Sequence, residues 1–392
     1  MKIPARSGER LFTANFILLW AASFTTFASF HILLPIFPLY IVSIGGTESQ
    51  TGLVIGVLTI TSVLTRPWIG LETDRLGKKR ILLWGTLALV IAAFSYTLAA
   101  TLVLLLLLRL FHGIAWAATT TPANALVADI APVSRMGEAM GYFGTASNLA
   151  MAVGPLLGVA LVSAFSFNSV FLVASGLALA ALAIITRIRE PGRIAPAVSS
   201  PNMAPARPAS QDLIYRPAIF PSFTIFTMTL TFGSLVTFLP LLAFRNNVNP
   251  GIFFTVYAIF LIISRPLGGK LADLAGRNAA VIPGMVALAL GIGLLAFARD
   301  LPLFLLAGAL NGIGFSFVNP ALMAMTVDRA APESRGAAMG TFSAAFDLGI
   351  GLGAILFGLL LERTSFEVLY LTSAGVAIIS MIIYIVIESR GR

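Results

Sequence analysis

Residues 66–80 read RPWIGLETDRLGKKR, a short polar stretch between two apolar runs, and a related stretch, RPLGGKLADLAGRNA, occupies residues 265–279. An offset of 199 positions (265 − 66) superimposes the Arg, Pro, Gly, Asp and Gly of the two copies: Arg66, Pro67, Gly70, Asp74 and Gly77 fall on Arg265, Pro266, Gly269, Asp273 and Gly276. The same offset places Gly154 on Gly353. A repeat that spans half of the chain indicates two copies of one structural unit.

The repeated stretch has the composition of a gate between helix ends. Its glycines permit a sharp turn and a close approach of two helices, and its basic residues are of the kind that collects on the cytoplasmic side of membrane proteins. An ordinary turn whose charges only fix the topology is the simpler alternative. Duplication in register favours the mechanical role, and the expected gate residues are Gly70, Asp74, Arg75, Gly77, Lys78 and Arg80, with Asp273, Gly276 and Arg277 in the second copy.

The composition excludes most soluble proteins. Of the 392 residues, 58% are hydrophobic and 10% charged, and the mean hydropathy is +0.95. Apolar runs of about 20 residues recur, the length of a helix that crosses a bilayer, whereas the ten-residue alternation of a β-barrel is lacking. The fold class is therefore an all-α polytopic membrane protein. The chain has no cysteine, which excludes disulfides and thiolate chemistry.

Twelve membrane spans are expected, in two sets of six. We place them at 11–42, 49–70, 80–99, 101–127, 137–163 and 168–187, and at 217–244, 250–270, 280–298, 302–327, 336–361 and 367–387. With both termini in the cytoplasm, the outer loops hold only Arg245, Arg299 and Arg363 of the 25 basic residues. This distribution satisfies the positive-inside rule. The net charge of +9 lies in loops between spans, so it does not indicate a nucleic-acid partner.

The domain organisation follows from the repeat. Residues 1–187 form one predicted six-helix bundle and residues 216–392 the other, in pseudo-symmetric copies. Between them, residues 188–215 carry five prolines among Ala and Ser, a composition typical of an extended or disordered tether. We interpret this segment as a cytoplasmic linker, in preference to a binding module, because it lacks aromatic anchors.

One acidic residue is predicted to lie near the middle of the membrane. If its span begins near Gly336, Asp347 lies about 16 Å deep. A buried acid at that depth is costly unless it is paired, hydrated or protonated, so such residues are usually functional. A role in carrying a proton or contacting substrate is the hypothesis, and a neutral carboxyl group hydrogen-bonded to a neighbouring helix is the alternative. Its counterpart at the offset is Asn148, which cannot titrate.

The first half carries its own intramembrane polar residues. Arg109 is predicted about 12 Å inside its span, with His112 one turn later on the same face. Arg109 cannot readily lose its proton, so we interpret it as a fixed charge that stabilises a nearby anion. His31 and His112 are candidates for proton handling, although either imidazole could simply bond to a neighbouring helix.

Prolines and glycines predict bends and close crossings. Pro35 and Pro38 remove intrahelical hydrogen bonds in the first span, which membrane helices tolerate when neighbours replace those bonds. Small residues in the fifth and eleventh spans permit tight helix packing. A stronger hypothesis is that Gly154, Pro155 and Gly158 form a hinge on which the bundle opens and closes.

These motifs together resemble the major facilitator superfamily over essentially the whole chain. Residues 70–80 (GLETDRLGKKR) resemble its signature between spans 2 and 3, and the second copy resembles it between spans 8 and 9. Residues 109–113 (RLFHG), 154–158 (GPLLG) and 35–38 (PIFP) resemble motifs of its proton-coupled drug antiporter branch. The chain departs from those patterns at Glu72, His112, Leu274 and Ala354, and it lacks the acid that several exporters have in span 1 or span 4.

The resemblance implies two six-helix bundles around a central cavity that opens alternately to the two sides. Asp74 and its basic neighbours would form the inner gate, Arg109 the charge linked to proton coupling, and Gly154 with Pro155 the antiporter hinge. Asp347, with His31 or His112, is left for coupling. The expected cavity-lining residues are Phe27, Asn148, Tyr257, Asn311 and Phe346.

The sequence thus favours proton-driven export of small amphipathic molecules. Uptake, or export of a polar metabolite such as a sugar, is the alternative. An enzyme is disfavoured because no cluster of His, Asp or metal-ligand spacings occurs, and a channel because no charged ring or filter sequence occurs. We expect no cofactor, no metal and no nucleic acid. The expected partners are a small-molecule substrate, protons and lipid, for a monomer in a bacterial plasma (inner) membrane.

Overall fold

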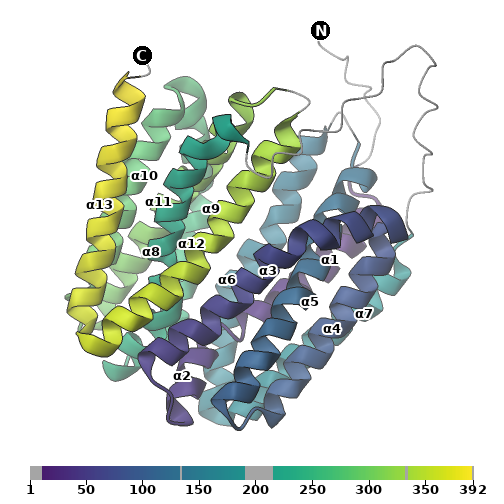
Figure 1. Cartoon of the computed structure of the whole chain (residues 1–392), viewed down its shortest axis with the longest axis horizontal. Helices are drawn as coiled ribbons and strands as arrows, with labels where there is room; N and C mark the ends of the chain where they lie inside the picture. Colours follow the sequence, from purple (N-terminus) through teal and green to yellow (C-terminus); the bar gives the residue numbers. More distant parts are fainter. Residues whose placement is uncertain (1–10, 133–134, 190–214, 332–333, 391–392) are drawn as a thin grey trace. The chain divides into compact units, whose positions relative to one another are not determined.

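The computed structural model describes residues 11–132, 135–189, 215–331 and 334–390, and within these ranges every regular element is helical. In chain order (Figure 1) the elements are α1 (Ala14–His31), α2 (Ile36–Ser43), α3 (Glu48–Leu76), α4 (Lys78–Ser95), η1 (Tyr96–Leu98), α5 (Leu102–Ile130), α6 (Met136–Ala164), α7 (Phe167–Arg187), η3 (Arg216–Ala218), α8 (Ile219–Arg245), α9 (Pro250–Leu274), α10 (Arg277–Leu295), α11 (Leu301–Asp328), α12 (Arg335–Arg363) and α13 (Phe366–Arg390).

Twelve spans in the described part of the chain are long and apolar enough to cross a membrane, with α1 and α2 counted as one. Their bounds confirm the predicted spans to within a few residues at most ends. The helix starts follow from capping: the Thr101, Ser166 and Asp300 side chains accept hydrogen bonds from backbone N–H groups in the first turns of α5, α7 and α11. The chain is a multi-pass integral membrane protein.

Only one of the two repeated glycines in each copy of the polar stretch makes the turn that the sequence predicted. Both α3 and α9 continue through most of it, to Leu76 and Leu274, so Gly70 lies inside a helix and makes no turn. The turn belongs to the second glycine of each copy. Gly77 has φ +100° and Gly276 has φ +87°, values in the left-handed region that only glycine adopts readily. Each of these glycines ends one helix and begins the next.

The first span is broken where prolines were predicted to bend it. α1 ends at His31, residues 32–35 form a turn, and α2 begins after Pro35. The ring of Pro35 clashes with a continuing helix upstream of it and supplies no N–H group. The break is buried, because Ile32 and Ile36 are completely enclosed.

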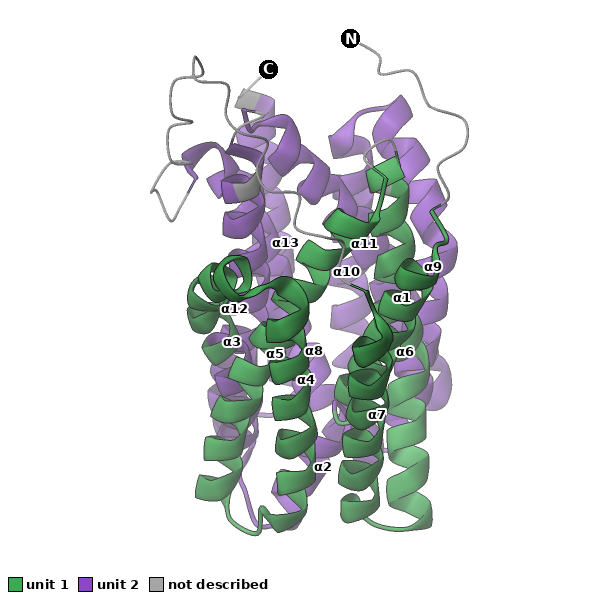
Figure 2. Ribbon diagram, turned by 90° about the vertical axis from the view of Figure 1, so that its right-hand side faces the viewer, with its two compact units in different colours: residues 1–33, 61–202 green, residues 34–60, 203–392 purple. Residues whose placement is uncertain are grey.

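Two compact units divide the chain, and Figure 2 colours them separately. Unit 1 comprises Met1–Leu33 and Thr61–Asn202. Within it, α1 packs on α6 and α7, and α4 packs on α5 and α7. A core cluster of apolar side chains, among them Phe16, Leu82, Leu126 and Ile185, joins these helices.

Unit 2 comprises Leu34–Ile60 and Met203–Arg392. Its packing repeats that of unit 1: α8 packs on α12 and α13, and α10 packs on α11 and α13. The core includes Met285, Leu288, Val318 and Leu322. Residues 34–60, which precede the first copy of the polar stretch, pack within this unit rather than with the rest of the first half, and the described residues of the predicted linker are only 188, 189 and 215.

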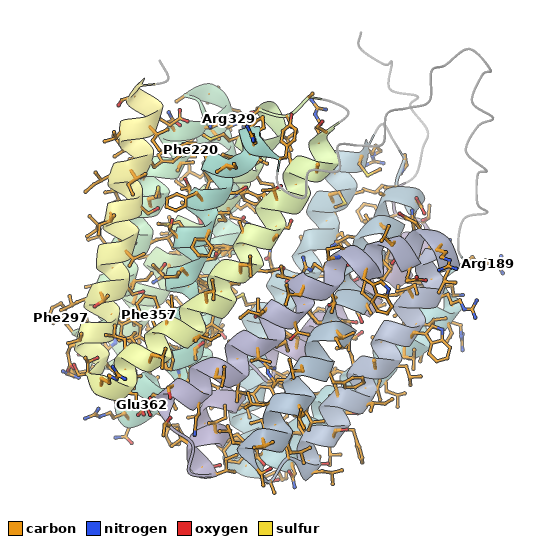
Figure 3. All side chains as sticks on the ribbon, viewed as in Figure 1. Arg189, Phe220, Phe297, Arg329, Phe357 and Glu362 are labelled. Carbon is orange, nitrogen blue, oxygen red and sulfur yellow. The ribbon has the colours of Figure 1, made fainter. Side chains whose placement is uncertain are left out.

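Polar ties reinforce the end of unit 2 at which α13 finishes. The Tyr384 hydroxyl donates to Asn278 (2.6 Å), whose Nδ2 donates to Glu388 (3.2 Å). Arg329 forms an ion pair with Glu388, and its guanidinium lies 5.0 Å from the centre of the Phe220 ring (Figure 3). These contacts connect α8, α10, α11 and α13 at one end of the unit.

Candidate functional site: gate pairs, buried polar groups and an aromatic cluster

The first residue of the helix that follows each copy of the repeated stretch forms an ion pair with an acid that the sequence analysis did not single out. Lys78 at the start of α4 donates to Asp129 near the end of α5 (2.5 Å). In unit 2, Arg277 at the start of α10 donates to Asp328 at the end of α11 (3.2 Å). The pairs obey the offset, since 277 − 78 and 328 − 129 both equal 199. Asp129 and Asp328 could have been found from the sequence, by looking for acidic residues that have an acidic counterpart 199 positions away.

The remaining predicted gate residues surround these pairs. Arg277 also bonds to Asp273 (3.2 Å), one turn earlier in the chain. Arg75 is largely exposed and lies 3.5 Å from Glu72, while Asp74 and Arg80 are exposed. A side chain at Gly70 would meet nothing within 4 Å. Each unit thus has one helix start tied to a neighbouring helix end by charge.

We expect a charge-reversal experiment to reveal these pairs. Lys78→Asp places two carboxylates together, and so lowers stability by about 1 kcal/mol, a modest amount because both groups are partly exposed. Adding Asp129→Lys restores the attraction and recovers at least half of the loss. Thermal unfolding of the purified protein in detergent measures both effects. The Arg277→Asp and Asp328→Arg pair gives a larger single-variant loss, because Arg277 has two partners. If the stability changes of the two single variants simply add in the double variant, for both pairs, the residues of each pair do not interact and the ion pairs are wrong.

Arg109 lies in a buried polar chain of unit 1. It is 4% exposed and hydrogen-bonded to Tyr96, whose hydroxyl group lies 2.8 Å from Nδ1 of His112. The arrangement that serves all three groups has Arg109 donating to the phenolic oxygen and Tyr96 donating to Nδ1. Two of these residues were predicted to share a helix face of α5. Tyr96, in η1, carries no sequence signal, because nothing about an isolated tyrosine at a helix end shows what it contacts.

His31 is the last residue of α1 and lies next to Gly154 of α6. A Cβ atom on Gly154 would lie 2.9 Å from the Cβ of His31, and one on Gly158 would collide with the Ile32 carbonyl oxygen. Both ring nitrogens of His31 are buried without a hydrogen-bond partner among the described residues, although Phe27 and Phe30 flank the ring. Two of the three predicted hinge residues, Gly154 and Gly158, therefore pack on the break between α1 and α2.

Two of the predicted cavity residues belong to an aromatic cluster of unit 2. Phe315 is central: its ring centre lies 5.3 Å from that of Phe232, 6.4 Å from that of Tyr257 and 6.0 Å from that of Phe346. The four rings come from α8, α9, α11 and α12. The three phenylalanines are only partly buried, whereas Tyr257 is enclosed. Half-buried aromatic faces are the surfaces that apolar and amphipathic ligands use.

Asp347 follows Phe346 in α12. Counted from Arg335, it lies about 18 Å along the helix axis, and the side chain is partly buried. All other acids of the described helices lie within about two turns of a helix end. An acid in the middle of an apolar helix beside aromatic rings can bind a cationic or hydrogen-bonding group, or hold a proton.

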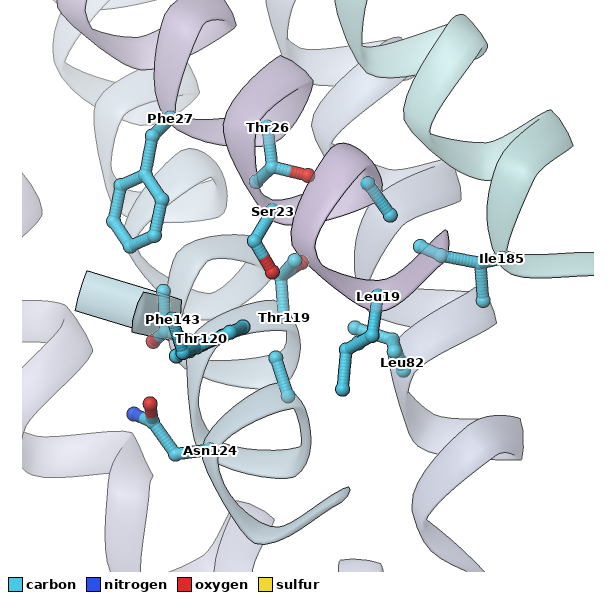
Figure 4. A pocket seen from close by; sticks show the side chains of 12 residues that line it. Leu19, Ser23, Thr26, Phe27, Leu82, Thr119, Thr120, Asn124, Phe143 and Ile185 are labelled. Atoms are coloured by element: carbon cyan, nitrogen blue, oxygen red, sulfur yellow. The ribbon is translucent and has the colours of Figure 1, made fainter. Parts of the chain in front are cut away.

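The other predicted cavity residues lie elsewhere. Asn311 is fully buried, donates to Ala307 of its own helix and packs against Gly291, so it faces α10. Asn148 is partly buried on α6. Phe27 contacts Trp116 (5.4 Å between ring centres) and lines a pocket of unit 1 with Ser23, Thr26 and Thr119 (Figure 4). That pocket's volume is about 20 Å³, room for about one water molecule.

No group of three or more His, Asp or Glu side chains gathers in a metal-binding arrangement within the part of the chain that the structure describes.

Within the described residues, twelve apolar helices in two related sets form the architecture of many secondary transporters. The sequence profile of the Major Facilitator Superfamily matches residues 19–253 and 246–392, and the chain belongs to that family. It is 26% identical over 385 residues to an uncharacterized MFS-type transporter of Methanocaldococcus jannaschii, covering 95% of this chain and 98% of that protein.

Two further likenesses bear on function and fold. Multidrug resistance protein MdtG of Escherichia coli (strain SMS-3-5 / SECEC) is 26% identical over 387 residues, which cover 94% of this chain and 93% of MdtG. The crystal structure of the nucleoside transporter NupG superimposes with a TM-score of 0.77 at 18% identity, over 95% of this chain and 99% of that one. The fold expectation, twelve spans in two pseudo-symmetric bundles, is confirmed.

Proposed function

We propose that this chain is a proton-coupled antiporter that exports small amphipathic molecules by alternating access. The observation that carries the proposal is Asp347, a carboxyl group in the middle of α12 that directly follows Phe346 of a partly exposed aromatic cluster. An acid in the middle of a membrane-spanning helix is a group that can hold or release a proton according to its access to water. Each protonation state then favours a different conformation, which is the requirement for coupling.

The buried groups of unit 1 have supporting roles in this proposal. Arg109 supplies a fixed positive charge held by Tyr96, and His112 and His31 are the auxiliary proton-handling groups. Gly154, Pro155 and Gly158 form the hinge in this proposal, because Gly154 and Gly158 pack on His31 and Ile32 at the break in the first span. The residues around Lys78 and Arg277 form the inner gate.

The substrate class follows from the cluster. Phe346 offers a partly exposed aromatic face in the cluster that also contains the enclosed Tyr257. Phe27 and Asn148 stay the predicted lining residues of the first half. The likeness to a multidrug resistance protein supports the same class, at low identity. We further propose a monomer in a bacterial inner membrane, with both termini in the cytoplasm and with bundles bounded near residues 187 and 216.

Transport into inside-out membrane vesicles tests the proposal. A fluorescent amphipathic dye, a radiolabelled sugar and a radiolabelled nucleoside are offered separately, with and without an imposed pH gradient that is acid inside. We expect gradient-dependent accumulation of the dye, abolished by a protonophore, and none of the sugar or nucleoside. Accumulation of the sugar or the nucleoside without the dye would contradict the proposed substrate class. Accumulation of the dye at the same rate with and without the pH gradient would contradict proton coupling.

A further inference from the structure

A second aromatic cluster lies in unit 1, around Trp116 of α5. The ring of Phe30 stacks on the indole, with 4.3 Å between the ring centres, and the ring of Phe27 meets it edge to face at 5.4 Å. Both phenylalanines come from α1, and all three rings are partly exposed. Unit 1 therefore offers aromatic surface between two of its helices, of the kind that apolar and amphipathic ligands contact.

Trp116 lies on the side of α5 that faces away from the exposed apolar stripe of that helix. The stripe is formed by the exposed side chains of Leu107, Leu110, Phe111 and Ile114. At 3.6 residues per turn, these four side chains point to the side of the helix opposite to Trp116. The aromatic cluster therefore belongs to the inner side of α5 within its unit, and not to the side that lipid covers.

A small pocket begins at Phe27 and continues toward the start of α1 and the end of α5 (Figure 4). Ser23, Thr119 and Thr120 contribute hydroxyl groups to its lining, and Asn124 contributes an amide group. Its volume of about 20 Å³ admits a group as large as one water molecule. The pocket therefore has room for a hydroxyl or amino substituent, whereas the ring that carries the substituent must stay at the aromatic cluster.

Two of the hydroxyl groups in this lining are arranged to accept a hydrogen bond. Thr119 donates to the carbonyl oxygen of Ala115 (2.8 Å), and Thr120 donates to that of Trp116 (2.9 Å). Each hydroxyl hydrogen is used in its own helix, while each oxygen keeps a lone pair. A substituent that donates a hydrogen bond therefore suits the pocket better than one that only accepts.

The charges around this site disfavour a cation. α1 contains no acid, and the only acid of α5 is Asp129, more than three turns from Trp116. Arg109 lies two turns before Trp116, about 10 Å along the helix axis and on the same face. At that separation, and with an effective dielectric constant of about 20, its charge weakens the binding of a cation by about tenfold. The site thus favours an uncharged ring over an organic cation.

The repeat gives an independent reason to connect this cluster with substrate. Trp116 and Phe315 are counterparts, since 315 − 116 equals 199, and each lies at the centre of an aromatic cluster. Thr119 corresponds to Val318, a buried apolar residue (318 − 119 = 199). The aromatic position is therefore common to both halves, whereas the hydroxyl group of Thr119 belongs to the first half alone.

We propose that Phe27, Trp116 and the pocket beside them bind an uncharged aromatic ring that carries a hydrogen-bond donor, such as a phenolic hydroxyl group. The ring packs on the aromatic side chains, and its substituent enters the pocket, where Thr119 and Thr120 accept from it. As part of a substrate path this site rests on the proposed function, and it narrows the exported class from amphipathic molecules in general to uncharged, phenol-like ones.

Equilibrium binding to the purified protein in detergent tests this site without transport. Tritiated 1-naphthol is the probe, and 1-methylnaphthalene and the 1-naphthylmethylammonium ion compete for it. We expect 1-naphthol to bind about fivefold more tightly than 1-methylnaphthalene, which lacks the donor, and about tenfold more tightly than the cation. Trp116→Ala weakens 1-naphthol binding about tenfold, because aromatic surface is lost. Thr119→Val brings the affinities for 1-naphthol and 1-methylnaphthalene within about twofold of each other.

Matched substitutions elsewhere control for general damage. Trp84→Ala makes the same change at a side chain of α4 that is 62% exposed, and it leaves the affinities unchanged. Thr326→Val does the same at a buried threonine of α11 that likewise donates within its own helix. Trp116→Phe keeps a ring, and it binds 1-naphthol within about threefold of the unaltered protein if Trp116→Ala folds poorly.

Three results would overturn the site: no binding of 1-naphthol, equal affinity for the three ligands, or an unchanged affinity in Trp116→Ala. Because binding needs neither a gradient nor transport, the proposed function fails separately. Binding in the expected order, without gradient-driven export of 1-naphthol or of the dye, would count against the proposed function alone.

Discussion

Replacing Asp347 by Asn should reduce uphill, gradient-driven export by about 100-fold or more, because an amide cannot release and rebind a proton and so cannot bias the two conformations. The amide has nearly the same shape and can still form hydrogen bonds, so the aromatic cluster around Phe315 stays intact. Exchange of labelled for unlabelled substrate across the membrane, which needs no net proton movement, should persist. Vesicle assays with and without an imposed pH gradient measure the two activities separately.

Two controls make that result specific. Asp347→Glu keeps a titrating group and should retain part of the uphill activity. Asp300→Asn makes the same chemical change at the N-cap of α11, where the side chain accepts from Leu303 N and Asn caps as well as Asp; it should have no effect. Unchanged uphill transport in Asp347→Asn would remove this residue from the mechanism.

Gly158→Val should have the second large effect, and it should act through packing. Even a Cβ atom at this position would collide with the Ile32 carbonyl oxygen at the break between α1 and α2. Backbone cannot move aside as a flexible side chain can, so we expect a loss of about 2 kcal/mol or more in stability and a loss of most transport. Thermal unfolding in detergent and dye export measure the two consequences.

The same substitution elsewhere in α6 is the control. A Cβ atom on Gly144 would meet nothing within 4 Å, so Gly144→Val should unfold near the temperature of the unaltered protein and should transport normally. If Gly144→Val and Gly158→Val behave alike, α6 is sensitive to any loss of glycine, and the contact with the first span has no special role.

The spans and the turns of the repeated polar stretch were predictable because their signals are local or repeated. Runs of apolar residues set the helix lengths, and Pro35 marked the break in the first span. The offset of the two halves located the turns, although only Gly77 and Gly276 turned out to make them. A single copy of the polar stretch contains Gly70 as well, and sequence alone does not tell a glycine that turns from one that lies within a helix.

Tertiary contacts were not predictable in the same way. Tyr96 belongs to the polar chain of Arg109 and His112 only because η1 and α5 come together, and Asn311 faces α10 rather than a cavity because of the rotation of α11. Glycines on α12 indicated close packing, but the sequence gives no sign that Gly351 contacts α3 while Gly353 contacts α8. Such assignments depend on helix rotations of a few tens of degrees.

The constant offset between the halves also allows each residue of the first half to be compared with its counterpart in the second half. If both halves descend from one ancestor, positions that still agree, such as Asp129 and Asp328, show what that ancestral unit needed in order to fold. Positions that have diverged are those at which the two halves can have different functions. Asp347 corresponds to Asn148, and Asn311 corresponds to His112. Exchanging the two residues of such a pair between the halves, and measuring transport, would show which differences between the halves the protein requires.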